Sequence, residues 1–200
     1  ACDTPGGPQL RVSGTIGGNV ANGITSADTA STLFALGARM VLEGPDGQRV
    51  VPIEEWYAGP GKTVREQNEL LVSIQIPRDH YEGFTGDYIK YGKRNALEIA
   101  TMGCCCLVKL AADHETIEDV RFAYGVAGPN PCRSKAAEDA ARGKTVAEAA
   151  AVVGDAALED LHPRDSWRAS KDFRMQLIKE MTRRALVNAA NKGGSSASWT

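Results

Sequence analysis

One stretch organises the chain: Gly14-Thr15-Ile16-Gly17-Gly18-Asn19-Val20-Ala21-Asn22-Gly23, followed by Ser26-Ala27-Asp28. Two adjacent glycines lie in a run of small and β-branched residues. Without a Cβ, glycine lets backbone N–H groups approach a ligand closely and can adopt positive φ. A cluster of such N–H groups forms a concavity that suits a phosphate or diphosphate. We therefore predict a glycine turn that is a candidate phosphate site, and a plain tight turn is the alternative.

A helix is predicted directly after this stretch. Thr25 or Ser26 can cap it, and Gly37 can end it. The N-terminus of such a helix favours an anion, whereas the carboxylate of Asp28 suits a ribose or ribityl hydroxyl better than a phosphate. The stretch is neither a P-loop nor the dinucleotide-binding fingerprint, because no Gly-Lys-Ser/Thr follows and the third glycine is wrongly spaced.

The composition is that of an ordinary globular chain of one or two domains. Its 200 residues are 42% hydrophobic and 24% charged, with a formal net charge of −2. The nearly balanced charge gives no reason to expect a nucleic-acid partner, and the lack of a long apolar run gives none to expect a membrane. Five cysteines without a repeated spacing do not predict a disulfide framework, so we expect a cytoplasmic protein.

Three consecutive cysteines, Cys104-Cys105-Cys106, are interpreted as buried strand residues rather than as a metal site. They lie in the apolar run 102–110, where successive side chains of a strand point to opposite faces. Three such neighbours cannot converge on one metal ion. We recognise no hydrolytic or acid–base constellation, and we interpret the three histidines as surface residues: His80, His114 and His162.

The first part of the chain is predicted to alternate short strands and turns. Residues 1–13 are predicted to form a loop, and residues 38–42 and 48–53 a hairpin around Gly44-Pro45-Asp46-Gly47. Residues 69–76 alternate in the manner of a half-buried strand, with Leu70, Val72, Ile74 and Ile76 on one face. The polar segment 78–86 is the predicted domain boundary.

The second part is predicted to be a three-stranded antiparallel sheet with helices, which makes the fold class α+β. The expected strands are 87–94, 101–110 and 117–126, and the expected helices are 131–142, 145–161 and one capped by Asp165 or Ser166. Phe173, Leu177, Met181 and Ala185 recur every four residues on the last helix. Its other face is basic, and we interpret it as solvated or, alternatively, as a partner contact: Arg168, Lys171, Arg174, Lys179, Arg183 and Arg184.

Several stretches together resemble one known family: residues 6–11, 15–19, 26–28, 70–77, 88–94 and 166–174. The chain is similar to the FAD-binding (medium) subunits of molybdenum hydroxylases, and most of all to those of bacterial xanthine dehydrogenases. The resemblance covers nearly all of the chain in order. It implies the second lobe of a two-lobed FAD-binding domain over residues 1–80, the family's C-terminal domain over 84–192, and a disordered tail over 193–200.

The resemblance implies that FAD is the cofactor. The FAD diphosphate and adjoining ribityl would be wrapped by Thr15, Ile16, Gly17, Gly18 and Asn19. Asp28 would accept a hydrogen bond from an FAD hydroxyl, and Leu71 would pack on the cofactor, although it could equally be a core residue. Lys90 would lie near the isoalloxazine ring, where a cation stabilises the charge of the reduced ring.

The resemblance also implies a function and partners. Substrate would be oxidised on a molybdopterin-binding large subunit, and electrons would pass through [2Fe–2S] clusters on a small subunit to FAD and then to NAD. Family members have a first flavin lobe upstream, with a glycine-rich Ala-Gly-Gly-Thr-Asp-type loop that this sequence lacks. We therefore expect an incomplete FAD site, which another chain or the rest of a longer protein would complete.

Two alternatives remain at this point. The chain could be a docking or assembly module of such a complex that does not bind flavin. It could also be the flavoprotein subunit of a relative that acts on carbon monoxide, nicotinate or an aromatic acyl-CoA.

Overall fold

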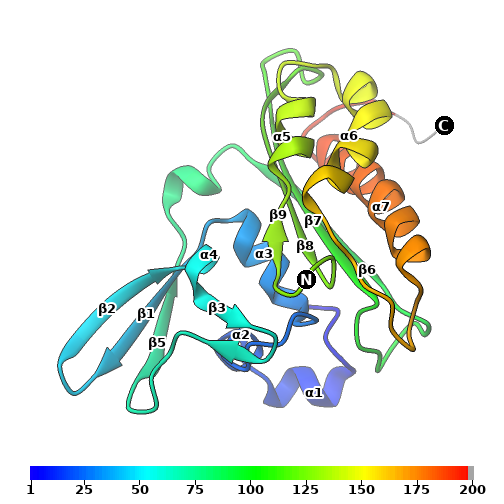
Figure 1. Cartoon of the computed structure of the whole chain (residues 1–200). Coiled ribbons are helices and arrows are strands. Elements are labelled where there is room, and N and C mark those ends of the chain that lie inside the picture. Colours follow the sequence, from blue (N-terminus) through cyan, green and yellow to red (C-terminus); the bar gives the residue numbers. More distant parts are fainter. Residues whose placement is uncertain (198–200) are drawn as a thin grey trace.

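The chain folds into a three-stranded and a four-stranded antiparallel sheet on either side of a central helix, with a small two-stranded sheet, β3-β4, in the first part, as a computed structural model describes for residues 1–197 (Figure 1). The α+β fold class is thereby confirmed. The first part contains α1 (Pro8–Ser13), α2 (Ile16–Ala21), α3 (Asp28–Ala35), β1 (Arg39–Gly44), β2 (Gly47–Pro52), α4 (Ile53–Trp56), β3 (Tyr57–Gly59), β4 (Lys62–Thr63), β5 (Leu70–Gln75) and the 3-10 turn η1 (Arg78–His80). The second part contains β6 (Thr85–Tyr91), β7 (Met102–Leu110), β8 (Ile117–Gly125), β9 (Cys132–Arg133), α5 (Lys135–Ala141), α6 (Val146–Asp160) and α7 (Lys171–Lys192).

The hairpin predicted around residues 44–47 is confirmed as β1 and β2, and β5 pairs on the other side of β1. The loop predicted over residues 1–13 is partly wrong, because it includes α1. Proline at the first position of that helix explains its start, since the missing N–H needs no partner there.

The strand β5 is where expected, but the face predicted to be buried is wrong. Leu70 is 71% exposed and Val72 46% exposed. The pairing with β1 shifts by one residue, so that Val41 faces Ser73 and Leu42 faces Leu71. Such a bulge interrupts the alternation of side chains. It places Leu71 and Ile74 together against the core of the first sheet.

The second sheet has four strands in the order β6-β7-β8-β9, so the predicted three-stranded sheet is wrong by one short edge strand. Cys132 and Arg133 pair with Tyr124 and Ala123, where the sequence predicts a helix. That helix, α5, begins only after Ser134, whose side chain accepts a hydrogen bond from the Ala137 N–H.

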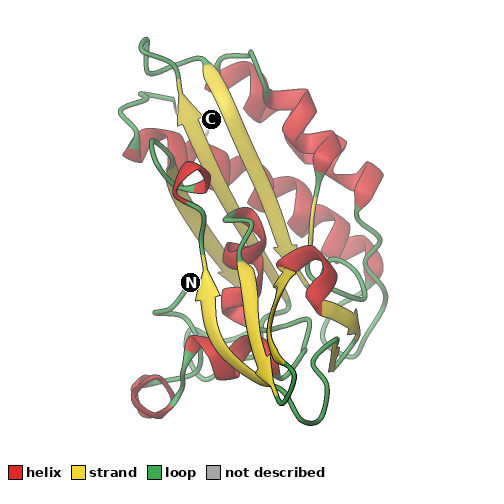
Figure 2. Ribbon diagram, turned by 90° about the vertical axis from the view of Figure 1, so that its left-hand side faces the viewer, coloured by secondary structure: helices red, strands yellow, loops and turns green. Residues whose placement is uncertain are grey.

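The strand β7 is buried on both faces, which confirms the interpretation of the three cysteines. Cys104 and Cys106 face the core beneath α6 and α7, and Cys105 faces the core around α3. Figure 2 shows the long strands of this sheet with helices packed against them. Burial raises the pKa of the Cys105 thiol to about 11 and raises those of its two neighbours as well. Protonated thiols are poor metal ligands, and no set of three metal-ligating side chains occurs within residues 1–197.

The long helix α7 covers the outer face of the second sheet and begins at the cap Ser170, not at Asp165 or Ser166. Its apolar face is confirmed for Leu177, Met181 and Ala185, which are buried. Its basic face is not uniformly solvated, because Arg174 is only 3% exposed. Of the predicted tail, residues 198–200 lie outside the described part, and no helix in residues 1–197 is long and apolar enough to cross a membrane.

The helices α6 and α7 cross closely at Gly154, which is buried. A Cβ at this position would lie 2.8 Å from the carbonyl oxygen of Lys179. We expect Gly154→Ala to lower the free energy of unfolding by about 1–3 kcal/mol, because the two backbones would have to separate. Urea denaturation followed by circular dichroism measures this change.

Gly17→Ala is the matched control, since Gly17 also lies in a helix but its Cβ would meet only Thr15 Oγ1, at 4.0 Å. It should leave the stability unchanged or raise it by up to about 1 kcal/mol. Equal effects of the two substitutions would contradict the assignment of Gly154 to a backbone contact.

Candidate functional site

The glycine stretch forms the helix α2 instead of the predicted open turn. Thr15 is its N-cap, and Thr15 Oγ1 accepts a hydrogen bond of 2.9 Å from the Gly18 N–H. Gly17 and Gly18 therefore have helical φ angles, and positive φ occurs only later, at Gly23 (φ +70°). Because a helix leaves its first N–H groups without intrahelical acceptors, the N–H groups of Ile16 and Gly17 remain open to another partner.

Asn19 joins this short helix to the next one. Its Oδ1 atom accepts hydrogen bonds from Thr29 N at 3.2 Å and Thr29 Oγ1 at 2.6 Å. The side chain thus caps α3 from outside, where the sequence predicts Thr25 or Ser26. Thr25 instead donates to the carbonyl of Pro129.

The N-terminal side of α2 lines a groove of about 600 Å³. Four residues of the glycine stretch line this groove: Thr15, Ile16, Gly18 and Asn19. Arg11 and other residues of the N-terminal segment, residues 1–13, line it as well. A Cβ at Gly18 would come within 3.1 Å of Thr15 Oγ1, so only glycine leaves both the cap and the groove undisturbed. We call this space the glycine groove.

An apolar pocket of about 320 Å³ adjoins the glycine groove. Ile16 lines both spaces, and Gly17 and Leu71 line the apolar pocket. The exposed side chains of Val72 and Ile76 form its outer rim. The bulge in β5 therefore brings Leu71 next to the glycine stretch.

Asp28 and Lys90 form a buried ion pair across the two parts of the chain. Lys90 Nζ lies 2.8 Å from Asp28 Oδ2, and the two side chains are 11% and 8% exposed. Tyr88 donates to Asp28 Oδ1 at 3.2 Å, and Lys90 also donates to the carbonyl of Thr4. Burial and the carboxylate of Asp28 raise the pKa of Tyr88 well above its ordinary value, so the phenol stays a donor.

Sequence reasoning missed Tyr88 and Thr4 as members of this cluster. The position of Tyr88 could have been found, because residues two apart on a strand share a face and Lys90 was already a candidate. The contact of the Thr4 carbonyl with Lys90 depends on the tertiary position of the N-terminal segment, for which the sequence contains no local signal.

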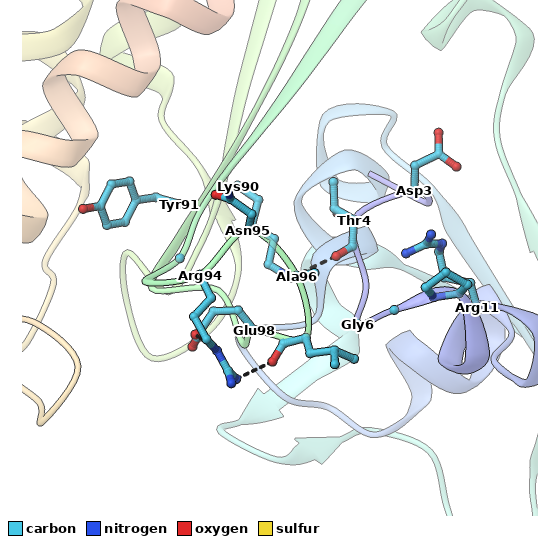
Figure 3. A pocket seen from close by; sticks show the side chains of 14 residues that line it. Asp3, Thr4, Gly6, Arg11, Lys90, Tyr91, Arg94, Asn95, Ala96 and Glu98 are labelled. Atoms are coloured by element: carbon cyan, nitrogen blue, oxygen red, sulfur yellow. Dashed lines mark hydrogen bonds and ion pairs between the residues drawn. The ribbon is translucent and has the colours of Figure 1, made fainter.

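A third pocket, of about 580 Å³, lies between the N-terminal segment and the loop 92–98 (Figure 3). Lys90 and Arg94 line one side of it and Arg11 the other. Gly6 and Arg11 line both this pocket and the glycine groove. Seven of the eight predicted site residues therefore line three neighbouring pockets, and the eighth, Asp28, is bound to Lys90.

Comparisons with known families place this geometry in context. Residues 1–79 match the family described as the FAD binding domain in molybdopterin dehydrogenase. Residues 87–189 match the CO dehydrogenase flavoprotein C-terminal domain. The chain is 37% identical over 195 residues to the xanthine dehydrogenase FAD-binding subunit of Escherichia coli O157:H7. The aligned region covers 97% of this chain and 66% of that protein.

Solved structures give the same picture. Carbon monoxide dehydrogenase from Hydrogenophaga pseudoflava has a TM-score of 0.84 at 33% identity, over 93% of this chain and 63% of that chain. Quinoline 2-oxidoreductase from Pseudomonas putida 86 has a TM-score of 0.87 at 25% identity, over 96% of this chain and 65% of that chain. The chain thus spans about two-thirds of the length of these relatives. It belongs to the family of FAD-binding flavoprotein subunits of molybdenum-containing dehydrogenases.

Proposed function

We propose that the chain is the flavin-holding, electron-transfer part of a xanthine dehydrogenase-like molybdenum hydroxylase. One observation supports this above the others: seven of the predicted cofactor residues line three neighbouring pockets, of which two share Gly6 and Arg11 and two share Ile16. An elongated ligand with both apolar and anionic parts suits such a site better than a compact one.

The residues present fit FAD chemically. The glycine groove offers N–H groups and the cation Arg11 to a diphosphate. The apolar pocket with Ile16 and Leu71 offers a surface for packing an aromatic ring. Lys90 supplies a positive charge in the third pocket. Apolar walls with a few convergent polar groups are typical of cofactor sites.

Each group would have a distinct task. Bound FAD would supply the redox chemistry by accepting and passing on electrons. Residues 15–19 would hold its diphosphate and ribityl through backbone N–H groups, and Leu71 would position it by packing. Lys90 would stabilise negative charge, and Asp28 would orient Lys90 in addition to accepting a hydrogen bond from an FAD hydroxyl.

The proposed partners follow from the relatives. Medium chains such as that of carbon monoxide dehydrogenase belong to heteromeric enzymes, and we propose a molybdopterin-binding large subunit, a [2Fe–2S] small subunit and NAD as the electron acceptor. We further propose residues 1–80 as the second flavin lobe, residues 84–192 as the C-terminal domain, and a cytoplasmic location. The relatives that match this chain include proteins named for xanthine, carbon monoxide and nicotine.

One observation favours the alternative of a docking module that does not bind flavin. Both carboxylate oxygens of Asp28 already have partners, Tyr88 and Lys90, within the chain. In that case the ion pair would be purely structural and would tie α3 to β6.

A titration with FAD separates the two proposals. Flavin fluorescence and visible absorption should show saturable binding by the chain, with one flavin per chain. Gly18→Val should weaken binding about tenfold or more, because a side chain would fill the groove and disturb the N–H groups that bind the anion. The control Ala151→Val adds a similar side chain on the exposed face of α6, outside the pockets, and should bind as the native chain does. A natively folded chain that binds no FAD even after the first flavin lobe of a relative is added would support the docking module instead.

The stability of Lys90 variants tests the ion pair itself. Lys90→Met should lower the free energy of unfolding by about 3 kcal/mol, because it leaves the Asp28 carboxylate buried without a cation. The exposed pair of Lys109 and Glu118 gives the control, and Lys109→Met should cost less than about 1 kcal/mol. The double variant Asp28→Asn/Lys90→Met should recover part of the loss in urea denaturation. A cost for Lys90→Met no larger than that of the control would refute a structural role of the pair.

A further inference from the structure

Three arginines surround a separate pocket of about 390 Å³, at the seam between the two parts of the chain. Arg164, Arg168 and Arg174 line it together with the hydroxyl residues Ser26 and Ser166. No aspartate or glutamate of the described chain lines this space. We call it the arginine pocket.

Arg174 is the most unusual of the three. It is 3% exposed, although it lies on the helix face that the sequence predicts to be solvated. Its guanidinium donates to the carbonyl of Thr101 at 2.5 Å, to that of Val126 at 3.4 Å and to Ser166 Oγ at 2.8 Å. These neutral acceptors hold the group in place without balancing its charge.

The guanidinium groups also have unused donors. Arg168 Nε and Arg174 Nε are buried and have no hydrogen-bond partner. Arg168 lies against the ring of Trp167, with 4.4 Å from its guanidinium carbon to the ring centroid. An unpaired buried donor costs free energy, and the orphaned Nε of Arg174 belongs to a side chain that lines the pocket.

The charges in the pocket repel one another. Within residues 1–197, none of the three arginines forms an ion pair with a carboxylate. Burial, Arg164 and Arg168 all lower the pKa of Arg174. A buried cation without a counter-charge is unfavourable, so an anion in the pocket would stabilise the arrangement.

We propose that the arginine pocket is an anion site that binds a phosphate or diphosphate group. Guanidinium groups match phosphate oxygens in geometry and donate charge-assisted hydrogen bonds to them. The hydroxyls of Ser26 and Ser166 offer further polar contacts. The pocket has the volume of a small-ligand site, so the phosphate can belong to a larger molecule or be a free ion.

The arginine pocket and the glycine groove are separate spaces. A short stretch of sequence leads from the arginine pocket to the proposed flavin site. No residue lines both spaces. Ile24, Thr25 and Ser26 line the arginine pocket, and two residues later Asp28 begins α3 and binds Lys90. An anion there would therefore be held beside the segment that supports the proposed flavin site.

Titration calorimetry with inorganic pyrophosphate tests the site. The native chain should bind one pyrophosphate saturably. Arg164→Gln and Arg168→Gln should each weaken binding about tenfold or more. Arg174 is not substituted, because its contacts with two carbonyl groups make it structural as well. The control Arg78→Gln removes the same charge from an exposed arginine outside the pocket and should change binding less than about twofold.

The outcomes are distinct from those of the flavin experiment. Gly18→Val should leave pyrophosphate binding unchanged, since the glycine groove is a different space. Displacement of pyrophosphate by NAD would identify a nucleotide as the source of the phosphate, and displacement by inorganic phosphate alone would identify the free ion. The proposal is overturned if binding does not saturate, or if Arg164→Gln and Arg168→Gln behave as Arg78→Gln does.

Discussion

The structure depends on the burial of β7 from both sides. Cys104 and Cys106 point into the core beneath α6 and α7, while Cys105 points into the core around α3. The first part of the chain is therefore packed on the back of the second sheet and shares its apolar interior. Hydrophobic stabilisation grows with the apolar area removed from water. Burial of β7 therefore stabilises both parts of the chain at once.

That shared core fixes the parts of the candidate site relative to one another. The helix α3 packs on β7 and β8, so its first residue, Asp28, is held next to the strand that carries Tyr88 and Lys90. The same helix receives its cap from Asn19, which places α2 and the glycine groove at its N-terminus. The proposed flavin residues come from four separate elements or segments, and α3 is the element that connects most of them.

The sequence predicted local features well and tertiary ones poorly. The β1–β2 hairpin follows from its Gly-Pro-Asp-Gly turn, and α6 follows from the capping box of Thr145 and Glu148. Both are local signals within a few residues. In contrast, the exposed face of β5 depends on a bulge set by pairing with β1, and the edge strand β9 depends on two residues that meet β8.

The candidate site shows the same division. The family resemblance proposed eight cofactor residues, and seven of them line neighbouring pockets, while their role in binding FAD stays a prediction. It did not predict that Asp28 and Lys90 bind each other, because their partners are decided by the packing of α3 against β7 and β8. The burial of Arg174 was also unpredictable, since a basic helix face gives no sign of which cation turns towards a carbonyl of another element.

The cap of α3 has a consequence for how the chain acquires its structure. Most helix caps are supplied by the residue just before the helix, so the helix can start on its own. Here the acceptor for the Thr29 N–H comes from Asn19, ten residues earlier and on another helix. The initiation of α3 is thereby coupled to the folding of α2, and the central helix can become fully stable only after the glycine stretch has formed.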